Sequence, residues 1–138
     1  MQKNYYDQYI IALYDILDDV KATLSILNAD KGRTINGPDE ALFHRVIEMS
    51  YQQDRKHAVD VLQSTLTRDM DHDTAVATIA RFADACTAPT PALTLTYETL
   101  DAQHFEHIAQ HLAQLYRYKG QMDVIYTLRA LEDDDASK

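Results

Sequence analysis

A long one-sided apolar stripe near the start of the chain constrains the fold more than any other feature. Between Tyr5 and Asn28, large apolar residues recur every three or four positions. At roughly 100° per residue they fall on one side of an α-helix. The stripe consists of Tyr6, Tyr9, Leu13, Ile16, Leu17, Val20, Leu24 and Leu27. A helix with such a stripe needs other helices to cover it, so we expect Leu13, Leu17, Val20 and Leu24 to be buried.

Three further helices follow from the same reasoning. One begins at Pro38-Asp39, where proline suits the first helical position, and continues to Thr65. A shorter helix starts at Asp71 or Asp73 and ends before Pro89, which pushes the preceding residue out of the helical region. The last starts at Asp101, and its apolar pattern changes phase near Gly120, so it is either one bent helix or two segments. Residues 1–138 are therefore predicted to form one all-α domain, a four-helix bundle.

The segment between the third and fourth predicted helices has a different pattern. Leu93, Leu95 and Tyr97 alternate with Thr94 and Thr96, which is typical of a strand. No second strand is predicted elsewhere in the chain. We therefore expect an extended crossover that lies on the bundle before the last helix.

Charge and composition exclude several classes of function. The 138 residues include 22 acidic and 13 basic ones, a formal charge of −9, which argues against nucleic-acid binding and against anionic membranes. No apolar run reaches the roughly 18 residues of a membrane-spanning helix, and the first residues lack the apolar core of a signal peptide. These features predict a cytoplasmic protein. The single cysteine, Cys86, is expected to be a small core residue.

One carboxylate interrupts the apolar stripe of the second predicted helix. Asp54 falls in the middle of this stripe if the helix is straight. Either the helix kinks between Gln52 and Lys56, or Asp54 is buried with a partner, because an unpaired buried carboxylate is costly. Lys119 is a candidate partner, since it also falls on an apolar face.

The last predicted helix is rich in histidine. His104, His107 and His111 lie on one side, and the last two are one turn apart, a spacing that can bind a transition metal. The competing interpretation is that they are half-exposed packing residues at the edge of the apolar stripe.

The end of the chain resembles a known family. Tyr118-Lys119-Gly120-Gln121, followed by Leu128-Arg129-Ala130-Leu131, is similar to the last-helix signature of the DinB/YfiT-like proteins, His-x-x-x-His-Arg-Gly-Gln and then Leu-Arg-x-Leu. The resemblance implies a four-helix bundle with a short third helix and a crossover before the last. Many members bind a divalent metal through three histidines, and some are thiol S-transferases.

The residues at the family's ligand positions differ here. His44 matches the second-helix ligand, but Gln114 and Tyr118 stand at the two last-helix positions. An amide is a poor zinc ligand, and a tyrosine would have to lose a proton with a pKa near 10. We therefore predict a degenerate candidate pocket of His44, Asp54, Gln114 and Tyr118, with no metal or other cofactor.

Three functions remain open from the sequence. The first is a non-catalytic binding or regulatory module, as a homodimer, that binds a protein or a small molecule. The second is a metal-dependent thiol S-transferase-like enzyme that holds zinc or nickel through His44, His107 and His111. The third is an acidic inhibitor or immunity protein that binds a basic partner.

Overall fold

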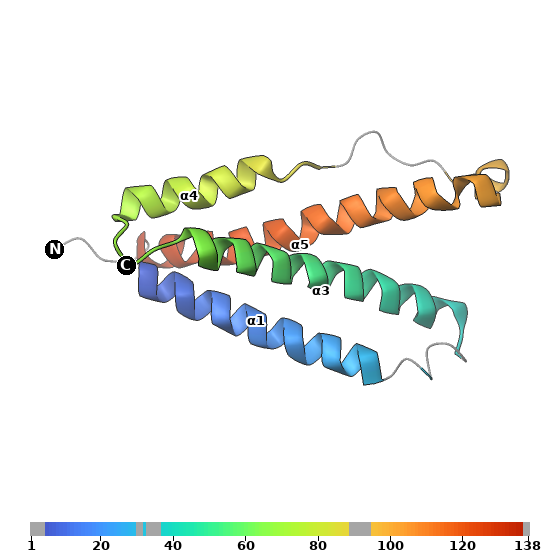
Figure 1. The fold of residues 1–138 in the computed structure, drawn as a ribbon, viewed down its shortest axis with the longest axis horizontal. Helices are drawn as coiled ribbons and strands as arrows, with labels where there is room; N and C mark the ends of the chain where they lie inside the picture. The colour runs from blue at the N-terminus through green and yellow to red at the C-terminus, as the bar shows by residue number, and fades with distance from the viewer. Residues whose placement is uncertain (1–4, 30–31, 33–36, 89–94, 137–138) are drawn as a thin grey trace.

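The computed structural model describes residues 5–29, 32, 37–88 and 95–136, and these residues form an all-α bundle (Figure 1). Four α-helices dominate it, and the part of the chain described here contains no strand, which confirms the predicted fold class. The helices are α1 (Tyr6–Ala29), α3 (Asp39–Thr65), α4 (His72–Ala85) and α5 (Phe105–Ala136). Two 3-10 turns, η1 (Tyr97–Leu100) and η2 (Ala102–His104), precede α5.

Three long helices set the shape of the molecule, and a short one covers part of it. α3 lies between α1 and α5 and runs antiparallel to α1 (Figure 1). α4 has 14 residues, against 32 in α5. Because α4 is this short, it covers only the half of the bundle that contains the start of α1 and the ends of α3 and α5 (Figure 1).

The hydrophobic core is confined to the half that α4 covers. Its fully buried large side chains are Tyr9, Leu13, Val20, Val59, Leu62, Val124, Ile125 and Leu128. Leu13 and Val20 are buried as the sequence predicts. Leu17 and Leu24, which the sequence also places in the core, are only half-buried. Leu24 lies beyond the last buried residue of α1, where α4 no longer covers the bundle.

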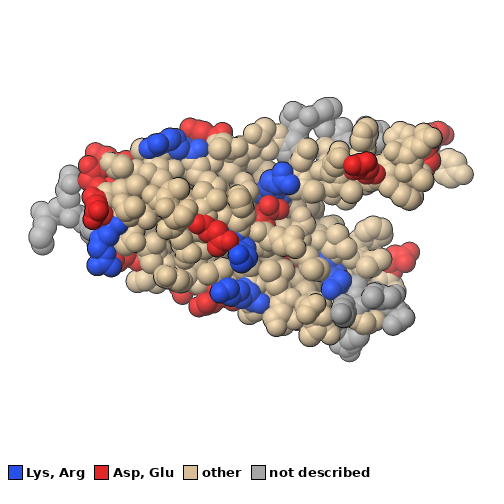
Figure 2. Space-filling model, viewed as in Figure 1, with Lys and Arg blue, Asp and Glu red and all other residues tan. Residues whose placement is uncertain are grey.

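The other half, which we call the open end, comprises residues 21–29, 37–51 and 95–119. None of these residues is fully buried. Most of the exposed large apolar side chains of the described chain lie here: Ile26, Leu42, Phe43, Val46, Leu95, Tyr97, Leu100, Phe105, Leu112 and Leu115. Figure 2 shows a hollow at this end, between the start of α5 on one side and the end of α1 and the start of α3 on the other.

Gly120 of α5 lies close to the backbone of α3. A Cβ atom at this position would lie 2.8 Å from the backbone oxygen of Tyr51 and 3.2 Å from the backbone nitrogen of Arg55. Only a residue without a side chain allows this contact. α5 is continuous through Gly120, so the alternative of two separate segments is wrong: the glycine permits close packing and does not end the helix.

The crossover differs in part from the prediction. Its residues 89–94, including Leu93, lie outside the described part of the chain. Thr96 has an extended backbone, but Tyr97 begins η1 instead of continuing a strand. The Thr96 backbone N–H donates to Thr99 Oγ1 over 2.8 Å. This local hydrogen bond favours a turn over an extended strand.

None of the described helices combines the length and the apolar character that crossing a lipid bilayer requires.

Candidate functional site

A cavity of the described structure lies between the end of α4 and the middle of α5. Its volume is about 390 Å³. The lining residues are Ala85, Cys86, Thr87, Ala88, Gln114, Arg117, Tyr118 and Gln121. We call this cavity the α4–α5 pocket. It contains two of the four predicted pocket residues, Gln114 and Tyr118.

Local helix geometry explains why these side chains meet. Gln114, Arg117, Tyr118 and Gln121 are separated by three or four positions, so they occupy neighbouring places on one face of α5. Across the pocket, α4 ends at Ala85, and the N–H of Cys86 bonds the carbonyl oxygen of Ala83 over 3.1 Å. This cap positions the residues after α4 opposite that face.

The buried Gln121 and the half-buried Cys86 contact each other in the pocket. Gln121 is 8% exposed, and its Oε1 accepts a hydrogen bond from Cys86 Sγ over 3.2 Å. Burial raises the pKa of the Cys86 thiol. The thiol therefore stays protonated near neutral pH and is a weak nucleophile, which agrees with the expected packing role of this cysteine.

Asp54 lies beside the pocket and pairs with one of its lining residues. Its side chain is 20% exposed, and its Oδ1 lies 3.8 Å from Nε of Arg117. The sequence predicts a cationic partner correctly, but Lys119 is the wrong one. Lys119 bonds Asp123 over 3.0 Å, one turn along α5, because a lysine at i and an aspartate at i+4 already face each other.

The pKa of Asp54 is raised, because burial disfavours the carboxylate more than the charges of Arg117 and His57 favour it. A raised pKa means that the folded protein binds a proton more tightly than the unfolded chain does. The contribution of Asp54 to the free energy of unfolding is therefore fully present below the ordinary pKa near 3.9. It is lost as the pH rises through the higher pKa that Asp54 has in the folded protein.

Asp54→Asn is accordingly expected to gain stability relative to the unchanged protein as the pH rises from 3 towards 7. The asparagine keeps the shape but carries no charge that burial penalises. Urea unfolding of both proteins at several pH values measures the difference between their free energies of unfolding. A constant difference across this range would show that Asp54 is not desolvated in solution.

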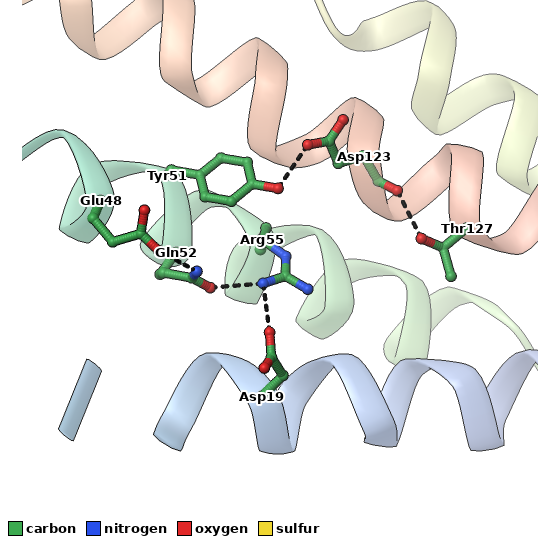
Figure 3. A network of polar contacts seen from close by, with 7 residues as sticks. All are labelled: Asp19, Glu48, Tyr51, Gln52, Arg55, Asp123 and Thr127. Carbon is green, nitrogen blue, oxygen red and sulfur yellow. Dashed lines mark hydrogen bonds and ion pairs between the residues drawn. The ribbon is translucent and has the colours of Figure 1, made fainter. Parts of the chain in front are cut away.

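A polar network missed by the sequence analysis joins three helices at the border of the open end (Figure 3). Arg55 Nη1 bonds Asp19 of α1 and Gln52 of α3, each over 2.9 Å. The Tyr51 hydroxyl donates to Asp123 of α5 over 2.6 Å. Burial and the nearby Asp123 carboxylate raise the pKa of Tyr51 to about 12, so it remains a donor.

A second polar contact ties the two ends of the chain. The Tyr9 hydroxyl donates to Glu132 of α5, and burial together with this bond raises the pKa of Tyr9. His72 of α4 lies 3.9 Å from the same carboxylate. No short sequence motif predicts contacts between residues so far apart in the chain.

The structure does not bring the alternative metal ligands together. Within the described ranges, no three histidine, cysteine or carboxylate side chains form a group that could hold a metal ion. His44, on the first turns of α3, and His107 are exposed, and His111 is half-buried. His44 is also absent from the lining of the α4–α5 pocket. His104 instead pairs with Asp101 over 2.6 Å.

No family model, curated protein or solved structure matches the chain. The resemblance to the DinB/YfiT-like proteins therefore stays a prediction.

Proposed function

We propose that the protein is a non-catalytic interaction module that works as a homodimer joined through the open end. The observation that carries this proposal is the contrast between the two halves of the bundle. One half has a closed core, whereas the other has no fully buried residue and holds most of the exposed large apolar side chains. A concentration of exposed large apolar side chains at one end of a bundle favours an interaction site there.

The exposed aromatic side chains supply a large part of the area that a stable interface needs. Phe43, Tyr97 and Phe105 are 64%, 90% and 60% exposed. Together these three aromatic side chains offer on the order of 400 Å² per copy. That is about half of the roughly 800 Å² that each partner buries in a standard interface, and the aliphatic side chains of the open end add to it.

A second copy fits this surface better than a basic partner does. Acidic and basic residues are nearly balanced in the open end, so most of the net charge of −9 lies elsewhere. Figure 2 shows few charged side chains on the facing arms. Homodimer interfaces are the apolar class, and a basic partner of an acidic inhibitor would find little charge complementarity here.

The geometry also suits self-association. Each copy has a hollow between its helices and an uncovered apolar arm, the start of α5. Two copies related by a two-fold axis can place the arm of each copy in the hollow of the other. The same interface then covers the arms and the hollows of both copies, and no surface is left for a third copy. The short α4 leaves room for this arm where a fourth long helix would otherwise lie (Figure 1).

A charged substitution in the open end tests the proposal. Phe43→Glu is expected to raise the dimer dissociation constant on the order of 30-fold or more, because a central aromatic anchor contributes about 2 kcal/mol or more. Sedimentation equilibrium over a range of protein concentrations measures the constant.

Ile11→Glu is the matched control, since Ile11 is 61% exposed on the half with the closed core. It adds the same charge and should leave the dimer intact. A protein that is monomeric at all concentrations, or equal weakening by both substitutions, would refute the proposed dimer.

A further inference from the structure

We propose that the α4–α5 pocket binds a small aliphatic carboxylate. Three of its lining residues, Gln114, Arg117 and Tyr118, belong to the open end. The evidence for a ligand site is nevertheless different from the evidence for the dimer: it is a set of hydrogen-bond donors that have no acceptor among the described residues.

The first donor is the amide of Gln121. Its carbonyl oxygen lies 3.2 Å from the Cys86 thiol, so the NH₂ group remains available as a donor beside the cavity that the residue lines. No described residue accepts a hydrogen bond from this NH₂ group. Gln121 as a whole residue is more than nine-tenths buried, but its amide nitrogen is not among the sealed side-chain atoms that lack a partner. The NH₂ group is therefore open to the cavity, where a ligand acceptor can bind it.

The second donor is the guanidinium of Arg117. Asp54 lies near Nε, at 3.8 Å, and this contact leaves the two terminal nitrogens without an acceptor among the described residues. The Tyr118 hydroxyl lines the same pocket and has no described partner either. Three donors of different types therefore border one cavity.

A carboxylate matches this arrangement. At neutral pH it is an acceptor only, with two oxygens that can bind a guanidinium in parallel and a further donor beside it. Ala85 and Ala88 supply apolar wall for a short hydrocarbon chain. A volume of about 390 Å³ lies within the range of small-molecule sites.

Asp54 sets the expected strength of binding. Its carboxylate competes for Arg117 and repels a ligand of the same charge. Removal of this charge by Asp54→Asn should therefore tighten the binding of a carboxylate severalfold. If the pocket recognised only the shape of the ligand, the affinity would not change.

Sodium butyrate is the probe, with butyramide and sodium chloride at matched ionic strength as comparisons. A ¹⁵N-resolved NMR titration follows the side-chain NH₂ signals of Gln121 in the full chain. We expect saturable shifts with butyrate and none with butyramide or chloride. Arg117→Gln should weaken butyrate about tenfold or more, the usual effect of losing a charged hydrogen bond.

Arg81→Gln is the control, because Arg81 is an exposed arginine of α4 that does not line the pocket. It should leave the affinity unchanged. Equal responses to butyrate and butyramide, a response to chloride alone, no saturation, or equal weakening by Arg81→Gln and Arg117→Gln would each overturn the proposal. Both arginines are exposed, but Arg117 also pairs with Asp54. Circular dichroism must therefore show the same helical content in both variants as in the unchanged protein before the affinities are compared.

Discussion

Gly120→Ala is expected to destabilise the protein by about 3 kcal/mol, the upper end of the usual cost of overpacking. The new methyl group would lie 2.8 Å from the Tyr51 carbonyl oxygen and 3.1 Å from Asp54 Cβ. The nearest atom belongs to the backbone, so no rotamer change relieves the contact, and the two helices must separate. An alanine in a helix normally gains about 0.5–1 kcal/mol over glycine, so a net loss isolates the effect of packing.

Gly32→Ala is the matched control. No atom of the described residues lies within 4 Å of the position that a Cβ would occupy there, so an added methyl group creates no close contact with them. Urea midpoints at one fixed protein concentration, with unchanged slopes, give the free energies of unfolding. Similar midpoints for the two alanine variants would mean that α3 and α5 do not approach closely at Gly120.

The same glycine shows what sequence patterns can and cannot predict. The change of phase near Gly120 is visible in the spacing of apolar residues, and it correctly marks a special position in the last helix. Whether a helical glycine is a break or a contact depends on the residue that faces it. Here that residue is Tyr51, which lies far away in the sequence, so only the assembled bundle distinguishes the two.

The candidate site was predictable to a similar extent. Helical spacing places Gln114 and Tyr118 on one face, and they share a pocket. The opposite wall comes from the segment after α4, and periodicity does not predict where this segment lies. The sequence does not predict that Gln121 belongs to the pocket, because its contact with Cys86 joins residues 35 positions apart in the chain.

The extent of the core was the largest error of pattern reasoning. The stripe of α1 runs without interruption from Tyr6 to Leu27, so periodicity assigns equal burial along its length. Burial also depends on what covers the stripe, and α4 ends halfway along the bundle (Figure 1). The apolar residues beyond it are therefore left for another surface, which is the basis of the proposed dimer.

Leu13→Ala and Leu17→Ala should distinguish a core that follows the whole apolar stripe of α1 from a core limited to its fully buried residues. Leu13 is fully buried, so its loss leaves a cavity between α1 and its neighbours, with an expected cost of about 2–5 kcal/mol. Leu17 occupies the same apolar stripe one turn later but is half-buried. Its truncation removes fewer contacts and leaves a site that water can reach, so it should cost clearly less than the Leu13 change.

Chemical unfolding of both variants at the same protein concentration measures the comparison. The two substitutions delete the same atoms from the same helix, so helix propensity and the unfolded chain contribute equally and cancel. Equal losses would mean that Leu17 is as deeply packed as the sequence stripe predicts, and that the core extends further along α1 than the structure places it. A cost for Leu13→Ala below about 0.5 kcal/mol, the range of ordinary surface positions, would exclude α1 from the core altogether.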